Sequence, residues 1–259
     1  MISCSKLSNS GVEKNSPRVI SKPSQSVQII GDSAFSYTNL VSATIQNGII
    51  DDYAFYGCEK LSNVILEDGV EKIGYACFLD CRELKDISLP NTLTSIEDRA
   101  FEGCRNLTEI FLPKNLSLIG DSVFQLCRGL SIINVDNDNS YFMSKDGVLF
   151  SKDGTILYCY PPGKMETSYV VPEGVTIISR SAFPLKNYSE YVSLTTIRLP
   201  KSVEIIEYAA TGNCANLTDV FYEGNESDKA NIVFPEEDNG MFFVNGNEHL
   251  LSAIWHYNQ

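Results

Sequence analysis

The sequence predicts a solenoid, a stack of short repeated coils whose strands form a parallel β-sheet, and two observations predict it. The first is that four kinds of residue recur every 23 positions: Phe55, Phe78, Phe101 and Phe124; Cys58, Cys81, Cys104 and Cys127; Leu61, Leu84, Leu107 and Leu130; Ile50, Ile73, Ile96 and Ile119. The second is that each Leu begins the same short motif, Leu-x-x-Ile-x-Leu or a close variant of it. Four columns in one register indicate structural units that stack on one another.

A period of this length that contains this motif is typical of a leucine-rich-repeat solenoid. One unit cannot bury its apolar residues alone, so neighbouring units share them as continuous ladders. We expect the parallel sheet on the concave face and short helical turns on the other side, where Ala-Phe-x-x-Cys presents Phe and Cys to the interior.

The end of each motif alternates as a strand does, so Val64 and Leu66 are expected to point inward while Ile65 points outward. Proline cannot donate a ladder hydrogen bond, and Pro90, Pro113 and Pro200 are therefore expected to end strands. Counting degraded copies as well, the sequence predicts eight strands, centred near residues 43, 64, 87, 110, 133, 169, 197 and 220.

The copies at the two ends of the repeat region are irregular. The first keeps Phe35 but has Thr38 in place of Cys, as expected of an edge unit. The last has Thr211 where Phe belongs, which predicts looser packing there.

The first and last copies of the repeat divide the chain into a polar tail over residues 1–26, a solenoid over 27–222 and a C-terminal cap over 223–259. Within the solenoid, two Asp-Gly pairs separate short β-prone runs, which predicts a β-hairpin insert at about 136–168 that leaves the stack. The cap contains Trp255 and is expected to cover the open edge of the sheet.

The repeat L-x-x-I-x-L-P-x-x-L-x-x-I-x-x-x-A-F-x-x-C closely resembles the BspA-like leucine-rich-repeat family over about residues 27–222. The segment YPPGK and the closing NEHLLSAIWHYN are also similar to parts of that family. The resemblance implies a bacterial, secreted or cell-surface protein that takes part in adhesion or other protein binding, with no catalytic residues. Residues 1–26 contain no secretory signal, so we expect one to have been removed.

The net charge of −13 makes nucleic acid and anionic membrane surfaces poor partners, because phosphate would be repelled. No apolar run is long enough to predict a membrane span. Cys4 could carry a lipid near a mature N-terminus, although no apolar segment precedes it. The oligomeric state stays open.

No cofactor, metal or catalytic site is expected. The repeated cysteines occupy an interior position where a free thiol acts as a small hydrophobe, and the chain has no C-x-x-C motif. Residues 136–147 resemble a calcium loop but lack the glycine at its sixth position and the acid at its twelfth. The two histidines, His249 and His256, stand in the cap without an activated serine motif, so we do not expect an enzyme.

The outward face of the strands is the candidate binding surface. Its central column reads Thr44, Ile65, Ser88, Phe111, Asn134, Val170, Arg198 and Phe221, and carboxylates lie beside it at Glu67, Glu109 and Asp219. Aromatic residues and Arg are frequent anchors of interfaces, and a solvated face needs few of them. This column predicts binding of an extracellular or host protein. Binding of a glycan, a passive spacer role, and covering of the Phe residues by the hairpin or cap remain alternatives.

Overall fold

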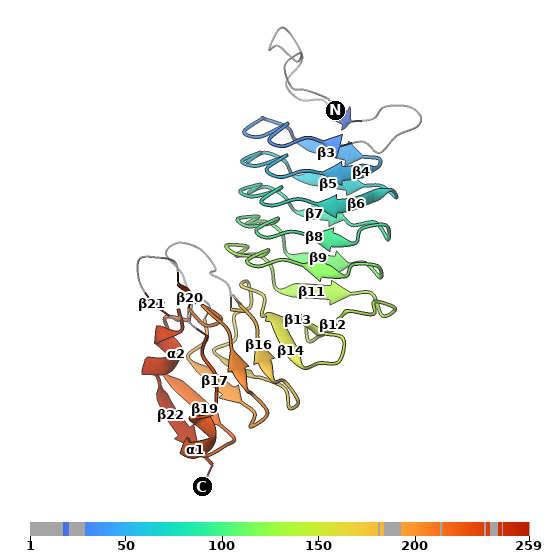
Figure 1. The fold of residues 1–259 in the computed structure, drawn as a ribbon. Helices are drawn as coiled ribbons and strands as arrows, with labels where there is room; N and C mark the ends of the chain where they lie inside the picture. The colour runs from blue at the N-terminus through green and yellow to red at the C-terminus, as the bar shows by residue number, and fades with distance from the viewer. Residues whose placement is uncertain are drawn as a thin grey trace.

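The computed structural model describes residues 18–20, 29–180, 182–183, 193–212, 214–235, 237–238, 243–244 and 246–258. These residues form a solenoid of short parallel strands in two stacks, joined by a β-hairpin (Figure 1). The strands of the N-terminal stack lie across the view in Figure 1, whereas those of the C-terminal stack run steeply. The solenoid therefore changes direction at the hairpin.

All eight predicted strands are present. They are β3 (Ser42–Ile45), β5 (Asn63–Leu66), β7 (Asp86–Ser88), β9 (Glu109–Leu112), β11 (Ile132–Val135), β15 (Ser168–Val170), β17 (Thr196–Leu199) and β19 (Asp219–Tyr222). Side chains alternate as expected, since Val64 and Leu66 are buried while Ile65 is exposed. Pro90, Pro113 and Pro200 follow the ends of β7, β9 and β17.

One further strand pairs with this row at each end. At the C-terminal end, β22 (Ile254–Tyr257) pairs in parallel with β19, so part of the cap adds a rung to the sheet. At the N-terminal end, β1 (Arg18–Ile20) pairs in parallel with β3. This strand lies inside residues 1–26, the segment predicted to be a polar tail.

A second row of short strands runs beside the first and was not predicted. It consists of β2 (Ile29–Ile30), β4 (Gly48–Ile50), β6 (Val70–Ile73), β8 (Ser95–Ile96) and β10 (Leu118–Ile119), and continues in the C-terminal stack with β16 (Ile177–Ile178) and β18 (Ile205–Ile206). The repeated Ile column belongs to this row, where Ile50, Ile73 and Ile96 are fully buried.

The short turns expected opposite the strands are present in the described coils as successive hydrogen-bonded turns and not as regular helix. In the coil at 51–58, the amides of Ala54, Tyr56 and Cys58 each donate to the carbonyl three residues earlier. The backbone is left-handed, with a positive φ, at Tyr53 and again at Gly57, and a right-handed helix cannot pass through such residues. The described helices, α1 (Glu226–Lys229) and α2 (Glu248–Ser252), lie near the C-terminus, as does a small hairpin of β20 (Glu237–Asp238) and β21 (Phe243–Val244).

The predicted hairpin exists but does not leave the stack. Its strands are β12 (Phe142–Lys145), β13 (Val148–Ser151) and β14 (Ile156–Cys159), and β14 pairs in parallel with β16 of the second row. All four side chains of β13 are buried. Leu149 packs into the core of the N-terminal stack, while Val148 and Phe150 pack into the core of the C-terminal stack. The hairpin is thus a layer between two hydrophobic cores.

The N-terminal core is built around a ladder of phenylalanine rings. Phe35, Phe55, Phe78, Phe101 and Phe124 stack in sequence order with ring centroids 5.2 to 6.2 Å apart. The planes of neighbouring rings differ by at most 14°. Identical rings in identical coils give this offset stacking, which adds to the stabilisation from burial.

The predicted looser packing at Thr211 is wrong. Thr211 is fully buried, and both its amide and its hydroxyl donate to Oδ1 of Asn247 at 2.9 Å. Nδ2 of the buried Asn247 donates to the Glu207 carbonyl at 2.9 Å. The segment around α2 therefore closes the last coil with a polar contact where the regular coils place a ring.

Candidate functional site

The candidate site is the strand face, whose side chains point away from the core shared by the coils. It consists of the outward side chains of β3, β5, β7, β9, β11, β15, β17, β19 and β22. Alternation places every second side chain of these strands on it. Ile65, Phe111 and Val170 are 45%, 52% and 58% exposed, although burial would be favourable for each of them. Ser88, Asn134 and Arg198 are also exposed, and Thr44 is half-buried.

Strand pairing divides the predicted column into three segments. Thr44, Ile65 and Ser88 lie in register on β3, β5 and β7. Phe111 pairs with Asn134 on β9 and β11, a pair of strands in a separate sheet. Val170, Arg198 and Phe221 lie in register in the C-terminal stack. Backbone pairing therefore groups the column into three segments.

The patch around Phe111 contains one residue, Ile132, that was not among the predicted site residues. Ile132 is 41% exposed and is the register partner of Glu109, which is also exposed. The same alternation that placed Asn134 outward also places Ile132 outward, two residues earlier. Phe111, Ile132, Glu109 and Asn134 together form an apolar centre with a carboxylate and an amide beside it.

In the C-terminal stack, His256 of β22 extends the column by one residue. Phe221 is the register partner of His256, and their rings stack at 4.4 Å with an interplanar angle of 14°. The guanidinium of Arg198 lies 4.4 Å from the centre of the Phe221 ring. Phe221 is half-buried between these two neighbours, so the expectation of an exposed ring holds for Phe111 and not for Phe221.

The carboxylates beside the column differ in their surroundings. Glu67 and Glu109 are exposed. Asp219 is half-buried, its Oδ1 lies 2.7 Å from Nε2 of His256, and its Oδ2 accepts a hydrogen bond from the Thr218 hydroxyl at 2.8 Å. These hydrogen bonds, that of His256 first, lower the pKa of Asp219 below its ordinary value. The strand face therefore has two exposed carboxylates, Glu67 and Glu109, and one, Asp219, that is hydrogen-bonded to His256 of the column.

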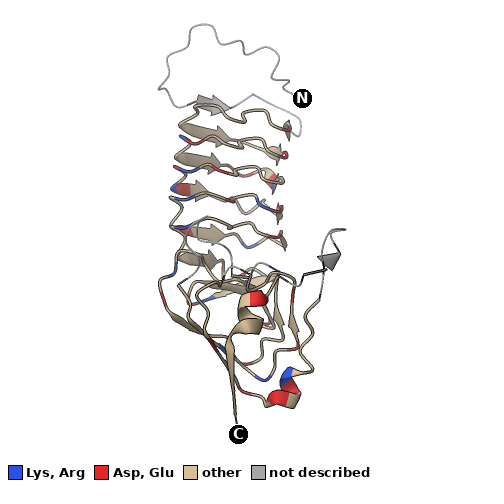
Figure 2. Ribbon diagram, turned by 90° about the vertical axis from the view of Figure 1, so that its left-hand side faces the viewer, with Lys and Arg blue, Asp and Glu red and all other residues tan. Residues whose placement is uncertain are grey.

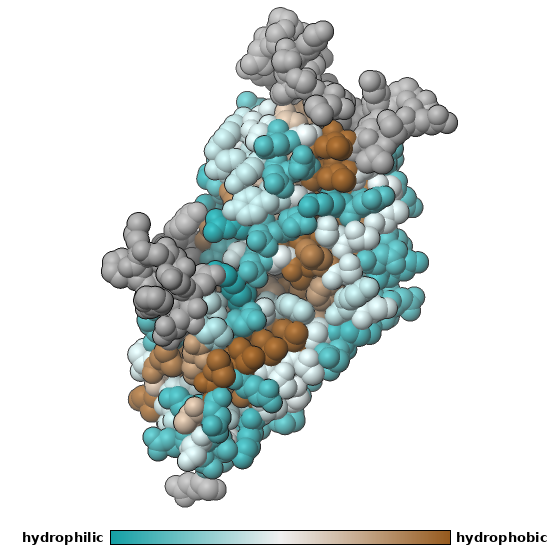
Figure 3. Space-filling model, in the orientation of Figure 1, coloured by the Kyte–Doolittle hydropathy of each residue, from teal (hydrophilic) through white to brown (hydrophobic). Residues whose placement is uncertain are grey.

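Charge and hydropathy on the visible surface are mixed. Figure 2 shows acidic and basic residues interspersed along the stack and not gathered in one block. Figure 3 shows apolar residues in separate patches surrounded by hydrophilic ones. Such patches can anchor a partner at several points without making the whole face hydrophobic.

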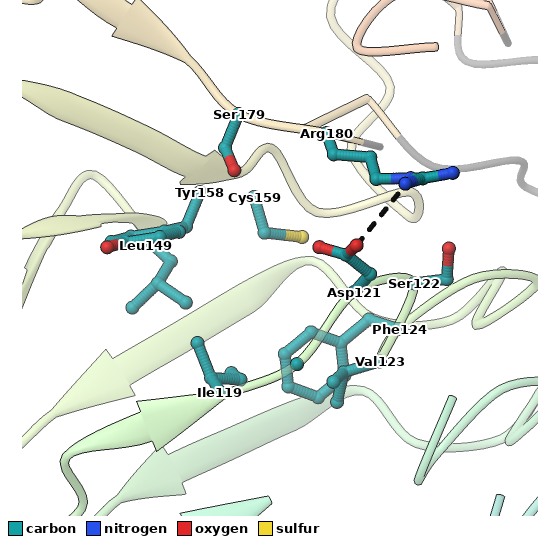
Figure 4. Close-up of a pocket in the computed structure, with 11 residues that line it drawn as sticks. Ile119, Asp121, Ser122, Val123, Phe124, Leu149, Tyr158, Cys159, Ser179 and Arg180 are labelled. Carbon is teal, nitrogen blue, oxygen red and sulfur yellow. Dashed lines mark ion pairs between the residues drawn. The ribbon is translucent and has the colours of Figure 1, made fainter. Parts of the chain in front are cut away.

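A cleft of about 50 Å³ lies where the N-terminal stack meets the hairpin (Figure 4). The coil at 119–124, Tyr158, Cys159 and the Ser179–Arg180 pair line it, and Arg180 Nε lies 3.5 Å from Asp121 Oδ2 across it. Burial raises the pKa of the Cys159 thiol far above its ordinary value, which disfavours the thiolate form that acts as a nucleophile. A ligand pocket is usually several times larger.

The described residues contain no cluster of three or more His, Cys, Asp or Glu side chains that could hold a metal ion. In the predicted turn at 136–147, the side chain of Asn139 is buried and bonded on both sides. Its Nδ2 donates to the carbonyls of Pro113 and Leu116, and its Oδ1 accepts from two backbone amides. Asn139 thus fixes the start of the hairpin.

Among the described helices, none is long and apolar enough to cross a membrane.

Two solved structures share the fold. The pneumococcal vaccine antigen PcpA has 22% sequence identity and a TM-score of 0.56, with 72% of this chain and 61% of PcpA covered. A leucine-rich repeat protein from Eubacterium ventriosum has 20% identity and a TM-score of 0.55, with 73% and 62% covered. This chain therefore spans less than two thirds of the length of either structure. No curated protein sequence matches it significantly.

The family model for the BspA type leucine-rich repeat region matches residues 23–146 and 160–237 in six copies. The gap between the two matched segments, residues 147–159, contains β13 and β14, the strands that separate the two cores. The match covers more than half of the chain and agrees with the solenoid described above. The chain belongs to the BspA-type leucine-rich repeat family.

Proposed function

We propose that this chain is a non-catalytic binding module of an exported or cell-surface protein, and that it binds another protein through the strand face. The observation that carries the proposal is the exposure of Ile65, Phe111 and Val170 at positions where alternation leaves no partner within the chain. Covering such side chains releases water from apolar surface, which contributes roughly 1 kcal/mol for each half-exposed residue.

The C-terminal part of the strand face adds a second kind of anchor. Arg198 is exposed, and its guanidinium is held over the Phe221 ring. A guanidinium held in place by a ring loses little conformational freedom when it meets a partner's carboxylate or carbonyl. Ile254, which is 64% exposed and pairs with Asp219, extends the apolar area on this side.

An extracellular location is part of the proposal. It is supported by family membership and by the shared fold with PcpA, which is a vaccine antigen. The runner-up ligand is a glycan, for which Phe111 with Glu109 and Asn134 would form a platform with polar neighbours.

The test is affinity capture of proteins from extracellular matrix and mucus extracts on the immobilised chain. The test variant is Phe111→Ser with Val170→Ser, and the matched control is Leu118→Ser, because Leu118 is 47% exposed on the second strand row. We expect one or more proteins to be retained by the parent and the control but not by the double variant.

Equal retention by all three chains would exclude the strand face as the binding surface. Retention of nothing by the parent would favour a spacer role, and saturable binding to purified carbohydrate alone would favour a glycan module. Circular dichroism of each variant, with unchanged thermal midpoints, excludes unfolding as the cause of any loss.

A further inference from the structure

A ridge of four tyrosines, Tyr37, Tyr53, Tyr56 and Tyr75, lies on the turn side of the first coils, away from the strand face. Tyr37 contacts Tyr56, Tyr56 contacts Tyr53, and Tyr53 contacts Tyr75, with ring centroids 4.7, 5.9 and 5.2 Å apart. Tyr37 is 70% exposed and the other three are half-buried. These rings lie outside the buried phenylalanine ladder, so they present aromatic surface to solvent.

The coils that carry this ridge are rich in carboxylates. Residues 29–60, which supply three of the four rings, contain Asp32, Asp51, Asp52 and Glu59 but only one basic residue, Lys60. Oδ1 of Asp52 accepts a hydrogen bond from the Tyr75 amide at 2.8 Å, which fixes this carboxylate beside the rings.

The neighbouring coils add carboxylates and cations that are already paired. The pKa of Tyr56 is raised first by hydrogen bonding with Tyr37, and then by partial desolvation and by nearby charges that include Asp80 and Glu102. The nearby cations are bound to acids, since Arg82 pairs with Glu59 and Asp80, and Arg99 pairs with Glu102.

Four aromatic rings elsewhere in the chain lie beside the chain's own cations. The rings of Tyr160, Tyr208, Phe221 and Trp255 each have a Lys or Arg group 4.2 to 5.9 Å from the ring centre. In the described part of the chain, no Lys or Arg lies over a ring of the tyrosine ridge in this way. The ridge combines ring faces and carboxylates, the two features that attract a cation, without an internal cation to occupy them.

We infer that the tyrosine ridge is a second binding surface, which takes the Lys or Arg side chains of a basic segment in a partner protein. The cation lies over a tyrosine face, where the ring quadrupole attracts it, and the carboxylate of Asp52 adds a favourable charge. This surface is separate from the strand face, so the inference does not depend on the proposed function.

The probe is a fluorescein-labelled peptide of alternating arginine and glycine, titrated with the protein while fluorescence anisotropy is measured. Its control is the same peptide with citrulline in place of arginine, which keeps the shape of the side chain but not its charge. We expect saturable binding of the arginine peptide that weakens as salt is raised, and no binding of the citrulline peptide.

Variants locate the site. Replacing both Tyr37 and Tyr56 by Ala should weaken binding about tenfold, as the loss of two cation–π contacts predicts, whereas replacing both by Phe should preserve it. Asp52→Asn, which keeps an oxygen acceptor for the Tyr75 amide, should weaken binding about threefold through the lost charge. Tyr141→Ala removes a ring that is 55% exposed outside the ridge and should change nothing, and Phe111→Ser should also leave peptide binding intact.

Three results would overturn the inference: no saturable binding of the arginine peptide, equal binding of the citrulline peptide, or unchanged affinity in the Tyr-to-Ala double variant. Tyr37→Ala alone provides a second test if the double variant is unstable, because Tyr37 is the most exposed ring of the ridge. If neither changes the affinity, the peptide binds elsewhere on this acidic chain and the ridge is not its site.

Discussion

The thiol of Cys104 donates a hydrogen bond to the main-chain carbonyl of Phe78, one coil earlier, over an Sγ to O distance of 3.3 Å. The same bond joins Cys58 to Phe35, Cys81 to Phe55 and Cys127 to Phe101, at 3.0 to 3.2 Å. A thiol is small and apolar enough for the core, and unlike the side chains of Ala and Val it can also donate a hydrogen bond to a main-chain carbonyl. This explains why the column holds Cys and not Ala or Val.

The first prediction concerns the reactivity of these thiols. Burial raises their pKa values, that of Cys127 to about 12, so almost none of the reactive thiolate exists at pH 8. We expect iodoacetamide to leave Cys104 and Cys127 unmodified in the folded protein and to label both in guanidinium chloride, as measured by peptide mass spectrometry. Rapid labelling of either residue under native conditions would contradict the described core.

The second prediction concerns the phenylalanine ladder. Phe101 is fully buried between Phe78 and Phe124, so Phe101→Ala should leave a cavity shared by three coils and lower the free energy of unfolding by about 3–5 kcal/mol. Urea denaturation measures the loss, and Phe101→Leu, which fills more of the space, should cost clearly less. A change below about 1 kcal/mol for the Ala variant would be inconsistent with an interior ladder.

The third prediction concerns the polar closure of the last coil. Restoring the repeat's own residue with Thr211→Phe should destabilise the protein by about 2 kcal/mol or more, because Asn247 Oδ1 would lose the hydroxyl donor and the ring would need space that Asn247 fills. Thr211→Ser keeps the hydroxyl and should cost less than about 1 kcal/mol. If differential scanning calorimetry found the Phe variant more stable than the parent, the contact with Asn247 would not be what closes this coil.

The fourth prediction concerns Asp153 in the hairpin turn. Its Oδ1 accepts hydrogen bonds from the Ser151 hydroxyl and from the amide and hydroxyl of Thr155, and these bonds lower its pKa to about 2. Because the folded pKa lies below the ordinary value of 3.8, the stabilisation is complete above pH 4 and is lost as the pH falls through about 2.

Asp153→Asn should therefore be less stable than the parent at neutral pH, and this difference should shrink on acidification through the same range. Titration of the Asp153 carboxyl carbon by NMR gives the pKa directly. A value near 4 would mean that the turn does not hold the carboxylate as described.

The repeat predicted those parts of the fold that depend on contacts between equivalent residues. The eight strand positions, the phenylalanine ladder and the buried thiols follow from a period of 23, because each side chain meets its own counterpart in the next coil. The direction of each strand residue followed from alternation, which correctly gave Phe111 as exposed.

Other features depend on contacts that the repeat does not encode. The Asp-Gly pairs fix the local turns of the hairpin, but they carry no information about what covers β13. The unbroken apolar run Val148, Leu149 and Phe150 was the available signal, since a strand buried on both faces does not alternate. Similarly, the left-handed conformation of non-glycine residues such as Tyr53 keeps the predicted turns from continuing as helices, and it cannot be read from residue type.

At the candidate site, the register of β22 against β19 was the missing information. It places His256 on Phe221 and beside Asp219, across an interval that the 23-residue period does not describe. The polar contact between Thr211 and Asn247 could not be predicted for the same reason. A Thr at the position of the repeated Phe suggests lost packing unless its hydrogen-bond partner outside the repeat is known.

The double-sided burial of β13 has a mechanical consequence. Leu149 and Phe150 are adjacent in sequence, yet they report on opposite halves of the molecule. A packing change that starts in one hydrophobic core reaches the other through this hairpin layer, in which β14 also contacts both cores through Cys159 and Leu157. We therefore expect a cavity made in one core to leave the packing of the other core unchanged.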